Sequence, residues 1–243
     1  MSRSRKRRPK SRVREIAQRF LYTLLQVLFI LMFVTISQVI LFKFIDPPVT
    51  YSMIRGWMNQ KLFDGYYQQP AYTWCSLNDI SPHLRRAVLA GEDQRFLRHH
   101  GFDFIEFKEA LKGIFSGKRI RGASTISMQA ARSLFLWSDR SMIRKLAEAY
   151  YTILLEALWS KERILEIYLN TVDWGGGVIG AEAATQKYFR THAHRITVDQ
   201  AASMVAILPS PYRRSPVNLN ERTQVRRDKI LREMQHMPLV ERR

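Results

Sequence analysis

Apolar and polar positions divide the chain into one long uncharged stretch followed by a series of amphipathic segments. The stretch runs from Leu21 to Phe42 and holds no charged side chain. After it, apolar residues recur three or four positions apart, which is the spacing of one helix face. In the most periodic segment, 144–159, they are Leu146, Tyr150, Ile153, Leu154, Ala157 and Leu158. The pattern predicts an all-α protein.

Capping residues indicate where several of these helices begin and end. Ser81 followed by Pro82 is typical of a helix start, and Thr197 with Gln200 forms the pattern of a capping box. Glu92 then falls at the end of the helix that Ser81 begins, at the edge of a cleft. Strand signals are few and short. The segments expected to be helical are 82–91, 102–114, 124–136, 144–159, 161–169, 181–189, 198–208 and 221–236.

The uncharged stretch is long enough for a membrane span. About 22 residues of helix cross the roughly 30 Å of hydrocarbon in a bilayer. A signal peptide has a shorter apolar core and a cleavage site with small residues, and no such site follows Phe42. The sequence therefore predicts an uncleaved transmembrane helix over 21–42, with a buried core helix as the alternative.

Charge then predicts the orientation. The net charge is +18, and nine of the 39 Lys and Arg residues lie in 1–20 beside a single acidic residue, Glu15. Positive residues next to a span stay in the cytoplasm, so the rest of the chain is expected on the periplasmic side of the inner membrane. A basic arm for nucleic acid is the alternative, but the place of the run beside the span favours topology, and no nucleic-acid partner is expected.

The length of 243 residues suits one sizeable domain with an appendage. The single cysteine, Cys75, permits no internal disulfide. We expect a basic cytoplasmic tail over 1–20, the transmembrane helix over 21–42, a juxtamembrane linker and membrane-proximal segment over 43–80, and the main domain over 81–243.

Three segments combine charge and hydrogen-bonding groups more densely than a core requires: 91–103, 122–132 and 144–148. Glu92 and Asp93 are adjacent, so on a helix they point about 100° apart and cannot act as one paired site. Ser124 begins a helix whose N–H groups suit phosphate or sugar oxygens, although it could also be a simple cap. Lys145 and Glu148 share a helix face, and a surface ion pair is the alternative.

Five segments, in this order, resemble the signatures of the bacterial peptidoglycan glycosyltransferases, and together they cover about residues 80–216. The first is Glu92-Asp93-x-x-Phe96-x-x-His99-x-Gly101-x-Asp103, and the second is Gly122-Ala123-Ser124-Thr125-Ile126-Ser127-Met128-Gln129. The others are Arg144-Lys145-x-x-Glu148, Lys161-x-x-Ile164-Leu165-Glu166-x-Tyr168-Leu169-Asn170 and Leu208-Pro209-x-Pro211. The chain has no Ser-x-x-Lys, so the transpeptidase of the bifunctional penicillin-binding proteins is not expected.

This resemblance implies a lysozyme-like, mostly helical glycosyltransferase domain with a membrane-dipping hydrophobic region near its cleft. The implied substrates are lipid II and the growing glycan chain. The chain would be the donor and lipid II the acceptor, a β-1,4 bond would form, and undecaprenyl diphosphate would leave. Because an α-linked donor becomes a β-linked product, one inverting displacement suffices.

The resemblance also implies roles for single residues. Glu92 would be the general base for the acceptor 4-hydroxyl, and Glu148 the second acidic residue, which orients cations or acts near the donor. The residues implied to bind substrate are Ser124, Thr125, Gln129, Arg132, Arg144, Lys145 and Arg121. The residues implied to build the loop of the first motif are Asp93, Phe96, His99, Gly101 and Asp103.

The second motif departs from the usual family pattern, Gly-Gly-Ser-Thr-Ile-Thr-Gln-Gln followed by Lys-Asn. Ala123, Ser127 and Met128 replace a Gly, a Thr and a Gln, and Arg132-Ser133 replaces the Lys-Asn. Ser127 keeps a hydroxyl, Arg132 offers a fork where Lys offers a point charge, and Met128 removes an amide.

No required cofactor is expected, although a Mg²⁺ or Mn²⁺ ion bound with the diphosphate stays open. The pairs His99–His100 and His192–His194 lack ligand spacing, so no metal ligation is expected. The expected partners are the substrates and the membrane, with cell wall synthesis or division proteins open. A lysozyme-like hydrolase would need a carboxylic acid of raised pKa, whereas the cations suit a diphosphate. An inactive scaffold would not need both Glu92 and Glu148.

Overall fold

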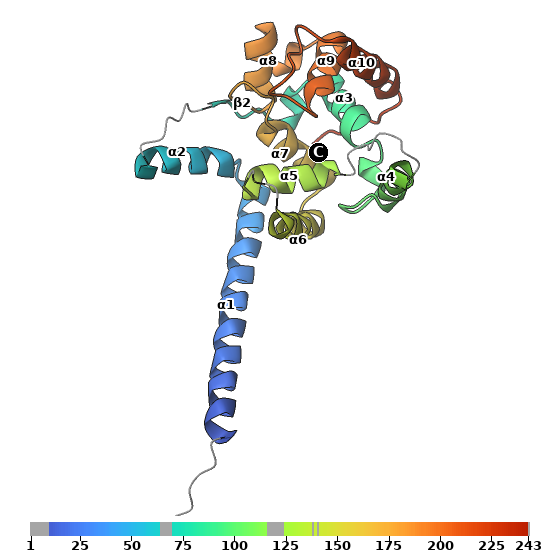
Figure 1. Cartoon of the computed structure of the whole chain (residues 1–243). Coiled ribbons are helices and arrows are strands. Elements are labelled where there is room, and N and C mark those ends of the chain that lie inside the picture. The colour runs from blue at the N-terminus through green and yellow to red at the C-terminus, as the bar shows by residue number, and fades with distance from the viewer. Residues whose placement is uncertain (1–9, 64–69, 116–123, 138, 140, 243) are drawn as a thin grey trace, which may run out of the picture. The chain divides into compact units, whose positions relative to one another are not determined.

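A computed structural model describes residues 10–63, 70–115, 124–137, 139 and 141–242. The chain forms two compact units, Met1–Ile45 and Asp46–Arg243. In the first unit, helix α1 spans Lys10–Phe44 (Figure 1). Its part Arg14–Phe44 is long and apolar enough to cross a membrane, by length and composition. The predicted apolar helix over 21–42 is therefore confirmed as a helix and as a candidate span.

The second unit is mostly helical, which confirms the predicted fold class (Figure 1). Its two strands, β1 Ala71–Tyr72 and β2 Val178–Ile179, are only two residues long and pair in parallel. Short 3₁₀ turns cover Leu77–Asp79, Phe96–Arg98 and Ala193–Arg195. The α-helices are α2 Tyr51–Phe63, α3 Pro82–Glu92, α4 Phe104–Phe115, α5 Ile126–Phe135, α6 Met142–Leu158, α7 Lys161–Thr171, α8 Ala181–Phe189, α9 Val198–Ile207 and α10 Glu221–Met234.

The expected helix starts are confirmed where a capping residue stands in the sequence. The Ser81 hydroxyl accepts from the amide of His83, with Pro82 in the first turn of α3. Thr197 and Gln200 form both hydrogen bonds of a capping box at α9. Ser141 and Ser160, which were not singled out from the sequence, cap α6 and α7 through one hydrogen bond each, from the amides of Arg144 and Arg163. These signals are reliable because donor and acceptor lie within three residues of each other.

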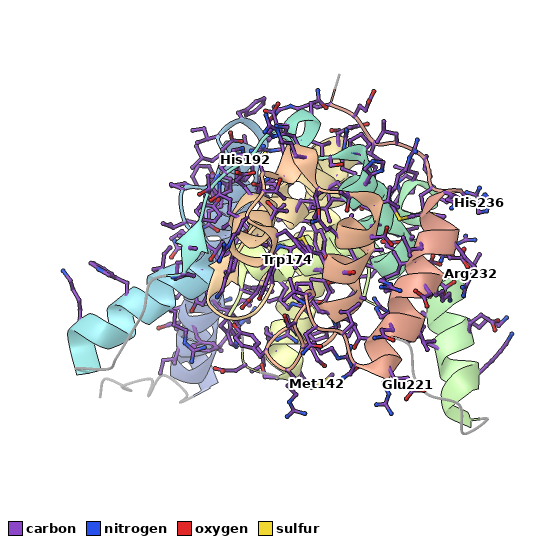
Figure 2. All side chains as sticks on the ribbon, turned by 90° about the horizontal axis from the view of Figure 1, so that it is seen from above. Met142, Trp174, His192, Glu221, Arg232 and His236 are labelled. Atoms are coloured by element: carbon purple, nitrogen blue, oxygen red, sulfur yellow. The ribbon has the colours of Figure 1, made fainter. Side chains whose placement is uncertain are left out.

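Helix α7 forms the centre of the core. All nine residues from Arg163 to Thr171 are buried, as expected of a helix enclosed on every side. It packs against α5, while α3, α9 and α10 pack against one another. Trp174, which follows α7, is fully buried near the middle of the unit in Figure 2, whereas Met142 at the start of α6 points outward at its edge.

The stretch between α1 and α3 contains structure that the sequence patterns do not indicate. It holds α2 and β1, and Leu77 and Ile80 are fully buried. The side chain of Asn170 donates to the carbonyl of Cys75 over 2.8 Å and accepts from its amide over 2.9 Å. Glu166 accepts from the amide of Leu77 over 2.9 Å. Two polar residues of the fourth motif thus hold residues 75–77 against α7.

Close helix packing fixes the end of α3. A Cβ atom on Gly91 would lie 2.4 Å from Cγ1 of Val205 in α9 and 3.2 Å from Cδ1 of Ile230 in α10. Only a glycine lets the three helices approach so closely at this point. The backbone that carries Glu92, the next residue, is therefore held between α9 and α10.

Candidate active site

Glu92 is the last residue of α3, as the sequence predicted. Its side chain is 14 % exposed. Oε2 accepts from Nε2 of Gln129 in α5 over 3.0 Å, and Oε1 accepts from Nη2 of Arg226 in α10 over 2.8 Å. Burial raises the pKa of Glu92, and Arg226, Gln129 and Arg132 oppose that rise. The carboxylate is therefore largely shielded from water, and its neighbours offset part of the cost of burying its charge.

Tyr168, on α7, lies close enough to Glu92 for the charge of that carboxylate to act on it. The side chain is fully buried, and its hydroxyl has no hydrogen-bond partner among the described residues. Burial, and then the nearby charge of Glu92, raise its pKa well above the usual value. Tyr168 therefore stays neutral, and its hydroxyl, without a partner among the described residues, lies near Glu92. Sequence reasoning assigned it no role, although it belongs to the fourth motif.

Glu148 lies on α6 and is completely enclosed. Oε1 is 2.6 Å from Nζ of Lys145, and Oε2 is 2.5 Å from Nη1 of Arg144. Arg144 also donates through Nε to the carbonyl of Asp139 over 2.9 Å. The alternative of a surface pair is wrong, because the Glu148 side chain has no exposed area. With a cation on each oxygen, Glu148 is arranged to orient Arg144 and Lys145.

The second motif connects the two carboxylates. Nε2 of Gln129, besides its bond to Glu92, lies 3.4 Å from the carbonyl of Ser124. The hydroxyl of Ser124 accepts from Nζ of Lys145, also over 3.4 Å. A continuous series of hydrogen bonds thus runs from Glu92 through Gln129, Ser124 and Lys145 to Glu148. The structure brings these five predicted residues together from three helices and the loop before α5.

Thr125 and Met128 are buried, so their side chains contact the protein interior. The Thr125 hydroxyl donates to the carbonyl of Gly101 over 2.6 Å and accepts from the amide of Met128 over 3.2 Å, so it caps α5. Met128 is buried, so the amide that this chain lacks would have stood in the interior. Arg132 lies near enough to Glu92 to lower its pKa. The predicted substrate-binding residue Arg121 lies outside the described residues.

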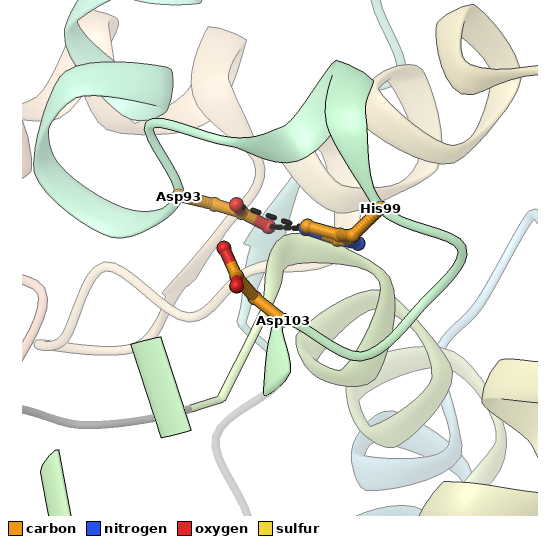
Figure 3. Close-up of side chains that lie close together, drawn as sticks. All are labelled: Asp93, His99 and Asp103. Atoms are coloured by element: carbon orange, nitrogen blue, oxygen red, sulfur yellow. Dashed lines mark hydrogen bonds and ion pairs between the residues drawn. The ribbon is translucent and has the colours of Figure 1, made fainter. Parts of the chain in front are cut away.

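Residues of the first motif contact one another and the start of α5. Nε2 of His99 lies 3.0 Å from both carboxylate oxygens of Asp93, as Figure 3 shows, and Asp93 also accepts from the amide of Ile126 over 3.0 Å. Asp103 accepts from two backbone amides at the start of α4 and forms an ion pair with Arg95 at 2.9 Å. Asp93 therefore joins the end of α3 to the start of α5.

Asp93, His99 and Asp103 also have donor atoms within 4.8 Å of one another, close enough for a metal ion (Figure 3). The oxygens of Asp93, however, already accept from the imidazole and from the amide of Ile126, and Oδ1 of Asp103 accepts from two amides. Among the described residues, Oδ2 of Asp103 forms only the ion pair with Arg95, without a hydrogen bond. Elsewhere, His192 pairs with Glu182 at 2.7 Å and stacks on His194. The geometry gives each of these groups a structural partner.

Gly101 allows the loop to turn against α6. Its φ is +89°, and a Cβ atom there would lie 2.7 Å from Cγ2 of Thr152. A residue with a side chain would be strained by the positive φ and obstructed by Thr152. The turn keeps the carbonyl of Gly101 in reach of Thr125, which positions the start of α5.

Sequence reasoning missed Arg226. It lies after the last of the five motifs, in a helix with four other basic residues, Arg222, Arg227, Lys229 and Arg232. The available signal was weak: an arginine in an amphipathic helix is usually a solvated surface residue. Its contact with Glu92 joins positions 134 residues apart, which no local pattern indicates.

A helical domain that places a shielded carboxylate beside a set of side-chain cations has the groups expected of an enzyme that acts on a negatively charged substrate. Comparison with known proteins specifies the family. Residues 59–235 match the family described as Transglycosylase. The chain belongs to the peptidoglycan transglycosylase family, as its five motifs predicted.

Curated relatives are similar in sequence to this chain over most of their length. A Biosynthetic peptidoglycan transglycosylase of Xylella fastidiosa is 44% identical over 190 residues, covering 78% of each chain. One of Chromohalobacter salexigens is 47% identical, covering 74% of this chain and 77% of the relative. One of Bacteroides thetaiotaomicron is 43% identical, covering 84% and 82%.

Proposed function

We propose that this protein polymerises lipid II into β-1,4-linked glycan strands for the cell wall and releases undecaprenyl diphosphate. Family membership supports the activity class. The observation that carries the proposal for this chain is the hydrogen-bonded series from Glu92 through Gln129, Ser124 and Lys145 to Glu148. Glu92 at one end of the series can act as a base, and Lys145 and Arg144, both bound to Glu148, provide cations at the other end. The reaction needs a base for the acceptor hydroxyl and positive charge for the leaving diphosphate.

Glu92 is the general base of this proposal. The acceptor 4-hydroxyl is a poor nucleophile and must lose its proton as it attacks C1 of the donor sugar. Each oxygen of a carboxylate accepts two hydrogen bonds, so Glu92 can hold Gln129 and Arg226 and still receive the hydroxyl. The proton moves to Glu92 and is later released to water.

The cations serve the leaving group. As the new β bond forms, the bond from C1 to the diphosphate breaks, and its electron pair stays on the diphosphate. That anion needs positive charge rather than a proton. The side chain of Lys145 is 42 % exposed although its ammonium is anchored by Glu148, so it can contact a ligand. Arg144 and Arg132 add charge. A Mg²⁺ or Mn²⁺ ion bound to the diphosphate would neutralise part of its negative charge, and no resident cofactor is required.

One observation favours hydrolysis of glycan strands as a second candidate. Burial raises the pKa of Glu92, and a hydrolase uses such a carboxyl as an acid. Against it, three groups around Glu92 stabilise the anion, and both oxygens of Glu148 are engaged by cations. These cations suit the departure of a diphosphate anion, which a transferase needs and a glycan hydrolase does not.

We also propose that the protein is anchored in a membrane. We expect α1 to be a single-pass anchor in the inner membrane, with the basic N-terminus in the cytoplasm and the enzyme in the periplasm. Exposed apolar side chains support contact with a lipid surface, since large exposed apolar patches mark interaction sites. On α6 and α4 they are Met142, Ile143, Leu146, Ile153, Phe104, Ile105 and Phe107. Protein partners in wall synthesis or division would add to this membrane association.

The deciding experiment uses purified full-length protein in detergent with labelled lipid II, beside Glu92→Gln. We expect the wild type to make polymer that muramidase digests, and the variant to lose at least about a hundredfold in rate. If the wild type instead shortens preformed glycan strands and makes no polymer, the hydrolase takes the place of the transferase.

A further inference from the structure

Arg226 reaches Glu92 from outside the five family motifs. Its Nη2 donates to Oε1 of Glu92 over 2.8 Å and to the carbonyl of Gly91 over 3.0 Å. The arginine side chain is 31 % exposed and the glutamate 14 %. Water therefore screens the pair only in part, and the charge of the arginine acts strongly on the carboxylate.

The helix that carries Arg226 is itself well anchored. Asn220 caps α10 by accepting from the amide of Thr223 over 3.0 Å. Thr223, Ile230 and Met234 are buried on the face that packs against α3 and α9. The backbone of Arg226 is therefore held in place by the packing of α10. Its guanidinium contacts Glu92 at the end of α3 directly from this helix.

Several charged or titratable groups surround Glu92. Arg226 comes from α10, Gln129 and Arg132 from α5, and Tyr168 from α7, while Asp93 is the next residue of the chain. Burial and Asp93 raise the pKa of Glu92, and among the groups that lower it Arg226 has the largest effect, ahead of Gln129 and Arg132. Tyr168 is neutral because burial raises its own pKa.

We propose that Arg226 is a positioning residue that fixes the orientation of the Glu92 carboxylate and keeps it negatively charged. This rests on the proposed function, in which Glu92 is the general base. Donors from two different helices hold the two oxygens, so the carboxylate has little freedom to rotate. Such preorganisation lowers the cost of reaching the reactive geometry. A protonated Glu92 could not accept the proton of the acceptor hydroxyl.

The test compares Arg226→Met with Arg227→Met in the full-length protein in detergent. Arg227 is the neighbouring arginine of α10 and pairs with Asp228 at 2.7 Å, so its replacement removes the same charge from the same helix without touching Glu92. We expect kcat of Arg226→Met to fall roughly tenfold at pH 7, the scale of removing one opposite charge beside a carboxylate. The acidic limb of its pH–kcat profile should move to higher pH, so that activity recovers as pH rises. Arg227→Met should match the wild type.

Arg226→Lys separates charge from geometry. It keeps the positive charge but loses the fork, so its acidic limb should stay near that of the wild type while kcat falls. A thermal melt checks that each variant is folded. Should Arg226→Met fail to fold, Arg226→Gln, which keeps a donor without charge, carries the same prediction.

A second measurement does not depend on activity. Carboxyl-labelled glutamate, observed by ¹³C NMR, gives the titration of Glu92 as the resonance that is missing in Glu92→Gln. We expect its midpoint at higher pH in Arg226→Met than in the wild type and in Arg227→Met. Equal midpoints would overturn the proposal even if the enzyme polymerises lipid II. A rise in KM with an unchanged pH profile would also overturn it and make Arg226 a substrate-binding residue.

Discussion

Lys161 places its ammonium nitrogen 4.5 Å from the centre of the Phe96 ring and 2.7 Å from the carbonyl oxygen of His99. The same nitrogen lies 2.7 Å from Oε1 of Glu156, which also accepts the hydroxyl of Ser127. Lys161 begins α7, Phe96 and His99 belong to the first-motif loop, and Ser127 lies in α5. One partly buried cation therefore joins the first, second and fourth motifs.

Replacing Lys161 by Met should destabilise the protein by about 3 kcal/mol. The change removes two charge-assisted hydrogen bonds and a cation–π contact, and it leaves Glu156 buried without its cation. Urea unfolding followed by tryptophan fluorescence would measure this. Lys112→Met is the matched control, since Lys112 forms an exposed pair with Glu109 and such pairs contribute at most about 1 kcal/mol. Equal midpoints for the two variants would contradict the role assigned to Lys161.

Glu148→Gln should reduce both stability and activity. The amide cannot neutralise Arg144, which is buried with it, and leaving one charge of a buried pair uncompensated costs about 3–5 kcal/mol. Lys145 would lose its anchor and bind the diphosphate less well. The measurements are the urea midpoint and the rate of polymer formation. Glu109→Gln, on the exposed face of α4, should leave both unchanged. An active, stable Glu148→Gln would show that the cations need no orienting carboxylate.

Two glycines should respond to alanine with opposite signs. Gly101→Ala meets both a positive φ and Thr152, so we expect a loss of at least about 1–2 kcal/mol. Gly113 lies inside α4, where an added Cβ meets nothing within 4 Å, so Gly113→Ala should stabilise by about 0.5–1 kcal/mol. Thermal unfolding of the two variants tests both signs. A neutral Gly101→Ala would mean that the first-motif loop has another accessible conformation.

The burial of Glu92 predicts a pH-dependent cost in stability. Its pKa is raised in the folded protein, so folding favours the protonated form, and stability is lost as pH rises through the folded pKa. Glu92→Gln has no such charge, so we expect it to have a higher Tm than the wild type at pH 7. The gain should shrink toward acid pH, as the wild-type carboxyl becomes protonated. A Tm difference that does not change with pH would contradict this account.

Metal chelation should leave the fold unaffected. A cation bound at Asp93, His99 and Asp103 at a hundred times its Kd would add about 2.7 kcal/mol and raise the Tm visibly. Because those side chains already have partners, we expect equal Tm values with EDTA, Mg²⁺ or Mn²⁺. A rise in Tm with Mn²⁺ that Asp103→Asn abolishes would instead assign a metal to this cluster. Any effect of Mg²⁺ on rate alone would belong to the diphosphate.

Local sequence was sufficient to predict several helix starts, the apolar helix and the five motifs. The capping hydroxyls of Ser81 and Thr197 mark helix starts because each bonds an amide two or three residues away. The uncharged stretch predicts an apolar helix because its length and composition suffice. The five motifs identified Glu92 and Glu148 because their order and spacing are specific to a family.

The surroundings of those residues follow from the folded core and not from local sequence. The sequence left a surface ion pair open for Lys145 and Glu148, whereas the fold encloses Glu148 completely and sets a cation on each of its oxygens. The unsatisfied hydroxyl of Tyr168 and the reach of Arg226 to Glu92 have no local signature. The physical reason is distance along the chain. A cap depends on a few neighbouring residues, whereas the ionisation of Glu92 depends on burial and charges that α5, α7 and α10 bring together only when the core forms.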